Sequence, residues 1–162
     1  MAVRLGICRD KNGYLLAEWL TGILLCGILF SGFYLGGLVS QRIIAVVETE
    51  CAAWEFARDI LHIRERALAG SDLGYVELRA DRKGYWVCRR PNLVEKKRDF
   101  ALGRSDPHLW FSSIPSYVIK FSVNGTPSSN GKYILQHKRL SAVKIQIDIQ
   151  PVTGRIRVAR MY

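Results

Sequence analysis

The sequence lacks the residue groupings that catalysis and metal binding require. Its three histidines, His62, His108 and His137, are scattered, and none of its four cysteines belongs to a Cys-x-x-Cys pair, so we expect no zinc site. No glycine-rich phosphate-binding loop follows an expected strand, and the serines near residue 128 lie in a turn rather than beside a base. We therefore expect neither an enzyme nor a bound cofactor.

One long segment also lacks charge. From Trp19 to Val39, 21 consecutive residues carry no charged side chain, which is long enough to cross a bilayer. In contrast, residues 40–162 contain 21 of the 24 basic residues and 12 of the 14 acidic residues. These numbers predict a polar, basic domain anchored in a membrane and make a free cytosolic enzyme a poor interpretation.

The residues that precede the apolar run predict its orientation. Arg4, Arg9 and Lys11 outnumber Asp10, and a basic start before an apolar run keeps that end in the cytoplasm. The run is too long for a secretory signal core, and no small-residue cleavage site follows it. Hydropathy alone thus favours a signal anchor in the cytoplasmic membrane, with the C-terminal domain outside the cytoplasm.

Glu18 lies on the apolar side of this boundary. A carboxylate costs roughly 2.5–3.5 kcal/mol at the membrane centre, and residues 14–39 contain no Lys, Arg or His to pair with it. A cut after Gly13 would give Tyr14 a new α-amine, which could pair with Glu18 of the same chain or of a neighbour. We predict that Glu18 promotes assembly, because its charge is satisfied best where subunits meet.

The segment from Lys11 to Leu20 resembles the type IV prepilin signature, in which a short basic leader ends in Gly and Glu is the fifth residue after the cut. Gly13 and Glu18 occupy these two places, and Tyr14 stands where Phe is usual. The resemblance implies a leader of residues 1–13, cleavage between Gly13 and Tyr14 by a prepilin peptidase, and N-methylation of Tyr14. It also implies assembly with other pilins through the N-terminal helix, an assembly platform protein and an ATPase, and a final place in a pilus or pseudopilus.

The apolar run continues into a helical pattern. One helix is expected from about Tyr14 to Ala69, roughly 84 Å long at 1.5 Å per residue. Residues 14–39 would cross the membrane or form a filament core, and residues 40–70 would form an exposed amphipathic half. The buried face of that half is expected at Ile43, Val47, Cys51 (or Glu50), Trp54, Ala57 and Leu61.

After residue 70 the apolar period changes to two. A hairpin is expected at 75–79 and 85–89, further strands at 117–123, 132–137, 143–149 and 155–160, and irregular chain at 90–116 except for a short strand at 109–111. Segments 123–129 and 149–158 are similar to the C-terminal half of the H-type pseudopilins of type II secretion and of a minor pseudopilin of competence systems. The expected architecture is α+β: a pilin-like fold with the long helix packed on an antiparallel sheet formed by residues 71–162.

Two further features leave alternatives open. Cys8 would leave with the leader and Cys26 lies in the apolar run, so only Cys51 and Cys88 could form a disulfide outside the cytoplasm; otherwise they are small buried apolar residues. The basic residues could bind a polyanion, although solvated strand edges commonly carry Lys and Arg as well, and we favour that interpretation. The polyanion candidates are Lys96, Lys97, Arg98, Arg155 and Arg157.

These features predict a minor pilin or pseudopilin, a structural subunit of a type II secretion, competence (DNA uptake) or type IV pilus-like filament. The alternative is a membrane-anchored extracytoplasmic module that binds DNA or an envelope polyanion. The residues do not distinguish secretion, competence and pilus systems, which share this architecture.

Overall fold

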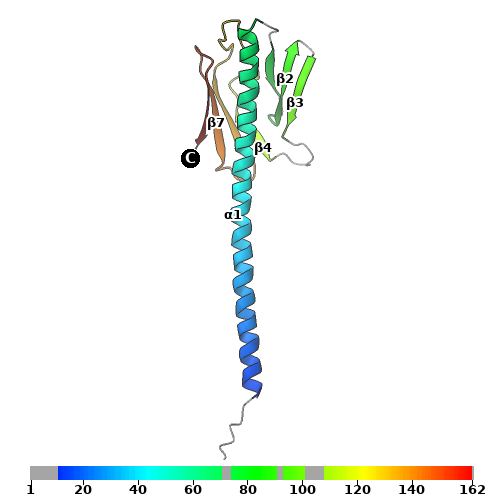
Figure 1. Ribbon diagram of the computed structural model, residues 1–162, viewed down its shortest axis with the longest axis vertical. Helices are drawn as coiled ribbons and strands as arrows, with labels where there is room; N and C mark the ends of the chain where they lie inside the picture. The colour runs from blue at the N-terminus through cyan, green and yellow to red at the C-terminus, as the bar shows by residue number, and fades with distance from the viewer. Residues whose placement is uncertain (1–10, 71–73, 91–92, 101–107, 162) are drawn as a thin grey trace, which may run out of the picture. The chain divides into compact units, whose positions relative to one another are not determined.

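A computed structural model describes residues 11–70, 74–90, 93–100 and 108–161 (Figure 1). The chain forms two compact units, Met1–Gln41 and Arg42–Tyr162. One helix, α1 (Lys11–Leu68), contributes to both units. The predicted long helix is therefore confirmed; it ends one residue earlier than expected and begins before Tyr14.

Eight strands follow α1, and all their pairings are antiparallel. They form two four-stranded sheets, in the orders β3-β2-β1-β5 and β4-β6-β7-β8. Within Arg42–Tyr162, strands of the two sheets lie on either side of α1 in the view of Figure 1. The bounds are β1 (Tyr75–Leu78), β2 (Gly84–Arg90), β3 (Leu93–Asp99), β4 (Leu109–Ser113), β5 (Val118–Lys120), β6 (Gly131–His137), β7 (Lys144–Ile149) and β8 (Ile156–Met161).

The antiparallel domain is confirmed, with three differences from the expectation. The strands divide into two sheets instead of one. Strand β3 lies in a region expected to be irregular, because its run of charged residues shows no apolar alternation. Strand β5 is shorter than the strand predicted at 117–123. Of the alternating apolar residues in that predicted strand, Ile119 and Phe121 are buried, while Tyr117 and Val123 are exposed.

The core is an aromatic cluster centred on α1. The ring of Phe56, which is 0% exposed, lies 4.9 Å from that of Tyr85 on β2, 5.1 Å from Phe111 on β4 and 5.8 Å from Tyr133 on β6. Ile60 of α1 is also fully buried in this cluster. Because Phe56 contacts rings from both sheets, the helix joins them into one core.

The predicted buried face of the helix is wrong. Ala57 is buried as expected, but Ile43, Val47, Cys51, Trp54 and Leu61 are exposed. The residues that face the sheets are mostly small: Ala45, Thr49, Ala52, Ala53, Phe56, Ala57, Ile60, Ile63 and Ala67. Alanine lets strands approach the helix backbone closely, so the larger apolar residues remain on the opposite side.

The connection between β7 and β8 depends on glycine. Gly154 has a φ of 61°, and its N–H donates to the carbonyl of Gln150 at 3.0 Å, which closes the tight turn between the two strands. A Cβ atom at this position would lie 2.5 Å from the carbonyl oxygen of Gly125. Both the backbone conformation and the available space therefore favour glycine here.

Candidate assembly surface

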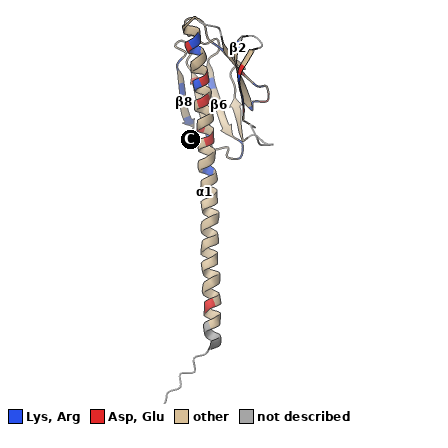
Figure 2. Ribbon diagram, turned by 45° about the vertical axis from the view of Figure 1, so that its right-hand side comes forward, with Lys and Arg blue, Asp and Glu red and all other residues tan. Residues whose placement is uncertain are grey.

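The apolar surface of α1 within the first unit is fully exposed. Every residue from Leu15 to Gln41 is exposed, and the segment is long and apolar enough to cross a membrane. Figure 2 shows the corresponding stretch of ribbon without basic or acidic colour beyond the acidic position near its start. A continuous apolar surface of this size is unstable in water and needs lipid or protein neighbours.

Glu18 is the acidic residue of this apolar segment. Its side chain has no hydrogen-bond or ion-pair partner among the described residues. It lines a shallow groove of about 520 Å³ together with Trp19, Gly22, Ile23 and Cys26. An ideal Cβ placed on Gly22 would meet no atom within 4 Å, so this glycine leaves open space beside the carboxylate. No described residue compensates this carboxylate, which lies in an apolar environment and is open to a cation from a neighbouring molecule.

The predicted processing residues lie at the start of the helix. Gly13 and Tyr14 belong to the backbone of α1, whose side chains are described from Leu15 onward. Residues 1–10 of the predicted leader, including Cys8, lie outside the described residues. Cleavage after Gly13 and methylation of Tyr14 thus remain predictions.

A second exposed apolar stripe continues along α1 in the domain. Val47, Trp54, Leu61 and Leu68 recur every seven residues, and all are exposed, Trp54 at 61%. Residues seven apart lie on nearly the same side of a helix. The stripe therefore leaves one face of the helix available for a protein neighbour while the alanine-rich face packs on the sheets.

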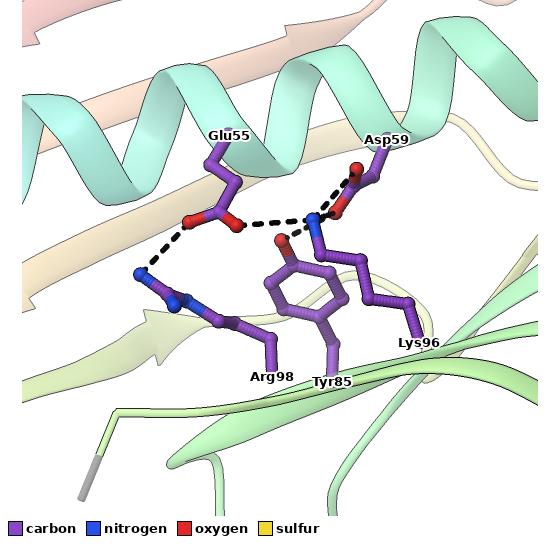
Figure 3. Close-up of polar contacts among 5 residues, drawn as sticks. All are labelled: Glu55, Asp59, Tyr85, Lys96 and Arg98. Atoms are coloured by element: carbon purple, nitrogen blue, oxygen red, sulfur yellow. Dashed lines mark hydrogen bonds and ion pairs between the residues drawn. The ribbon is translucent and has the colours of Figure 1, made fainter. Parts of the chain in front are cut away.

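Opposite charges hold α1 against the first sheet (Figure 3). The Lys96 ammonium lies 2.7 Å from Asp59 and 3.0 Å from Glu55, and the Arg98 guanidinium lies 2.8 Å from Glu55. The Tyr85 hydroxyl donates to Asp59 at 2.8 Å. We call Glu55, Asp59, Tyr85, Lys96 and Arg98 the helix–sheet clamp.

Titration within the clamp follows from its burial. Burial, with the Asp59 charge adding to it, raises the pKa of Tyr85 far above its ordinary value, so the hydroxyl remains a donor. Partial burial is the largest single influence on Lys96 and lowers its pKa, but hydrogen bonds and charges from Asp59 and Glu55 together outweigh it and raise that pKa. Lys96 therefore keeps its charge at neutral pH.

The basic candidates for polyanion binding do not form one patch. Lys96 and Arg98 are engaged by the carboxylates of α1, and the ammonium of Lys97 lies over the Trp86 ring, 6.0 Å from its centroid. Arg155 and Arg157 are exposed at β8, an edge strand of the other sheet, where Arg157 is opposite Asp148. Figures 1 and 2 place β8 and the β2–β3 hairpin on opposite sides of α1.

The sequence leaves a Cys51–Cys88 disulfide open as one of two alternatives, and in the structure the two thiols are separate. Cys51 is a free thiol on the exposed side of α1, and Cys88 is a free, buried thiol on β2. Burial is the largest influence on Cys88 and raises the pKa of its thiol, while a hydrogen bond with the Tyr75 hydroxyl opposes that rise. Cys88 thus behaves as the small buried residue of the alternative interpretation, and Cys51 does not.

Sequence reasoning missed the clamp and the exposed stripe. The clamp had a signal, since Glu55 and Asp59 form a like-charge pair four residues apart on one helix, which calls for cations from elsewhere. The stripe also had a signal, since the apolar spacing includes Val47, Trp54 and Leu61, but this spacing was assigned to the buried face because alanine gives little contrast in hydropathy.

Comparison with known proteins bears on the fold. No family model matches the chain, and no curated protein sequence matches it. Among solved structures, the type IV minor pilin FimU of Pseudomonas aeruginosa PAO1 is similar with a TM-score of 0.55 and 17% identity, over 69% of this chain and 88% of that one. The minor pseudopilin EpsH from the type 2 secretion system of Vibrio cholerae is similar with a TM-score of 0.53 and 13% identity, over 70% of this chain and 97% of that one. The chain therefore has the pilin fold of these structures.

Proposed function

We propose that this protein is a minor pilin or pseudopilin, a membrane-anchored structural subunit that assembles into a type IV pilus-like, type II secretion or competence filament. One observation carries the proposal: a domain with the pilin fold continues from a helix whose residues 15–41 are all exposed and almost all uncharged. Such a helix suits both a membrane before assembly and a bundle of like helices afterwards.

Glu18 would direct the assembly step. A prepilin peptidase acting after Gly13 would create an α-amine on Tyr14, four residues before Glu18 and thus on the same helix face. A neighbouring subunit shifted along the filament axis could bring its own amine to Glu18. Each pairing of an amine with Glu18 would neutralise the carboxylate in its apolar environment, which favours the assembled state.

The exposed stripe would extend this contact surface beyond the membrane. Val47, Trp54 and Leu61 would face a neighbouring subunit, because they lie on the side of α1 away from the sheets. The platform protein and ATPase would supply force, since we expect this chain to bind no nucleotide.

The processing step is tested on protein isolated from cells that have a prepilin peptidase. Mass spectrometry should find Tyr14 as the mature first residue, with the added mass of one methyl group. An intact Met1, or a cut elsewhere, would contradict the proposed maturation.

The assembly step is tested with Glu18→Ala. We expect membrane levels to be retained, while incorporation into sheared filaments falls about tenfold or more, which corresponds to at least about 1.4 kcal/mol. Glu77→Ala is the matched control, because Glu77 is an acid on the face of β1 opposite the buried Val76 and Leu78, and so lies away from the exposed stripe of α1. Equal incorporation of both variants would refute the role of Glu18.

The alternative function, a binding module for DNA or an envelope polyanion, has weaker support. Two of its candidate cations, Lys96 and Arg98, are neutralised by α1. Salt-dependent retention of DNA by the full chain, lost in Arg155→Gln/Arg157→Gln, would favour it.

A further inference from the structure

The two sheets have four edge strands, and three of these edges are protected against pairing with another chain. Strand β3 has two register shifts against β2, and five of its seven residues are charged, with both signs present. The backbone of Lys120 in β5 is bonded on both its N–H and its carbonyl by Ser128 of the following loop. In β4, the N–H of Phe111 donates to the carbonyl of Arg82 in the turn between β1 and β2. Bulges, mixed charges and covering chain are common means of preventing edge pairing.

Strand β8 is the fourth edge, and it has neither a bulge nor a covering segment among the described residues. Figure 1 shows it as the strand that ends at the C-terminal label, at the outer margin of the domain. Its register against β7 runs without a shift over six residue pairs. A long, regular strand of this kind is a template for one more strand.

The backbone groups that face the free edge follow from the hydrogen bonds to β7. The N–H of Gln150 donates to the carbonyl of Arg155, and antiparallel pairs alternate between bonded and non-bonded. Residues 157, 159 and 161 therefore bond β7, whereas the N–H and carbonyl groups of Ile156 and Val158 point to the free edge. Among the residues that the structure describes, no group bonds Ile156 or Val158 on that side.

The side chains beside this edge differ between the two faces of the sheet. Ile156 and Val158 are half-buried against the core. Arg155 and Arg157 are exposed on the opposite face, because successive residues of a strand point to opposite sides. Within the described ranges no carboxylate forms an ion pair with either arginine, not even Asp148, the cross-strand neighbour of Arg157. An added strand would therefore meet apolar groups on one face and two cations on the other.

We propose that the free edge of β8 pairs with an extended, acidic segment of another protein, which becomes a fifth strand of the second sheet. The backbone of Ile156 and Val158 supplies the hydrogen bonds to this segment. Asp or Glu at alternate positions of the segment faces Arg155 and Arg157. This interaction goes beyond filament assembly through α1 and does not depend on it.

The charge of the edge selects this occupant. A second copy of β8 would bring its own arginines, and like charges on paired strands are destabilising. A nucleic acid would pair its phosphates with the arginines but would leave the backbone of Ile156 and Val158 without strand hydrogen bonds. An acidic strand satisfies the backbone groups and the guanidinium groups together.

The test uses the full chain in detergent micelles and a synthetic peptide of alternating valine and glutamate. Nuclear magnetic resonance measures the hydrogen exchange of each β8 amide with and without the peptide. We expect the amides of Ile156 and Val158 to exchange at least about tenfold more slowly with the peptide, because their N–H groups become bonded. The amide of Ala159 already bonds β7 and should change little. Unaltered exchange at Ile156 and Val158 up to the solubility limit of the peptide would overturn the proposal.

Charge reversal tests the recognition of acidic side chains. Arg155→Glu/Arg157→Glu should bind the valine–glutamate peptide at least about tenfold more weakly and should prefer a valine–lysine peptide. Lys83→Glu/Lys97→Glu is the matched control, because it reverses the same charge at exposed residues of the first sheet. Unchanged exchange of the β7 amides shows that each variant is folded.

Two outcomes would refute the assignment of the edge. Equal weakening in both double variants would show that net charge, and not β8, governs binding. Retention of DNA by Arg155 and Arg157, with no peptide-dependent protection of the Val158 amide, would assign the two arginines to a polyanion instead.

Discussion

The helix–sheet clamp predicts the cost of removing one carboxylate. Asp59 is 12% exposed and accepts hydrogen bonds from Tyr85, which is 0% exposed, and from Lys96, which is 35% exposed. In Asp59→Ala the buried Tyr85 hydroxyl loses its acceptor, which costs about 1–3 kcal/mol. The loss of the Lys96–Asp59 ion pair costs less, because the ammonium still pairs with Glu55 and is partly accessible to solvent. We therefore expect the free energy of unfolding to fall by about 2–4 kcal/mol.

A double-mutant cycle tests the reasoning directly. Tyr85→Phe alone should cost about 1 kcal/mol, whereas in the Asp59→Ala background it should recover part of that variant's loss, because the stranded hydroxyl is then gone. Guanidinium unfolding of the full chain in detergent, followed by near-ultraviolet circular dichroism of the aromatic cluster, measures each value. Glu65→Ala, an exposed acid on the same helix, should change stability by less than about 0.5 kcal/mol. Additive effects of the Asp59 and Tyr85 substitutions would show that the hydrogen bond contributes no coupling.

Three further predictions concern packing, backbone and pH. Phe56→Ala should lower the free energy of unfolding by about 3–5 kcal/mol, because it empties the centre of the core. Trp54→Ala should change the free energy of unfolding by no more than about 0.5 kcal/mol and should instead reduce incorporation into filaments. Equal losses of stability in the two variants would contradict the assigned helix faces. Gly154→Ala should destabilise by at least about 1–3 kcal/mol in the same unfolding assay, because φ is positive and the added Cβ meets a carbonyl oxygen, and unchanged stability would contradict that geometry. Burial is the largest influence on His137 and lowers its pKa below its ordinary value. The unfolded chain therefore binds the extra proton first, and stability should fall as pH drops through about 6.5. His137→Gln should flatten that slope, and an unaltered slope in this variant would refute the assignment.

Much of the architecture could be predicted because its signals are local. The uncharged run to Val39 indicates a membrane-length helix, and the alternation of isoleucines with polar residues in β7 indicates a half-buried strand. Both patterns depend only on neighbouring residues. The pilin fold could be expected because the segment from Lys11 to Leu20 resembles the prepilin signature and segments 123–129 and 149–158 are similar to pseudopilins.

The missed features depend on contacts between distant residues. Strand β3 was missed because its charged side chains are balanced by Glu55 and Asp59, about 40 residues earlier in the chain, instead of by an apolar alternation. The helix face was misjudged because Ala52 and Ala53 are buried by close approach of the strands, which hydropathy does not measure. The sequence left the state of Cys51 and Cys88 open because spacing in a sequence does not tell which side of a helix faces a strand.

The order of the core elements along the chain has a consequence for biogenesis. The helix that carries Phe56 and Ile60 is synthesised before any strand that covers it, and β7 and β8 are made last. At roughly 5–20 residues per second, the alanine-rich face of the helix waits on the order of 5–20 s for its final neighbours. A ribosome that stalls before β7 would leave this face open to chaperones and proteases. The nascent subunit is then most vulnerable at the helix, which is the part synthesised first.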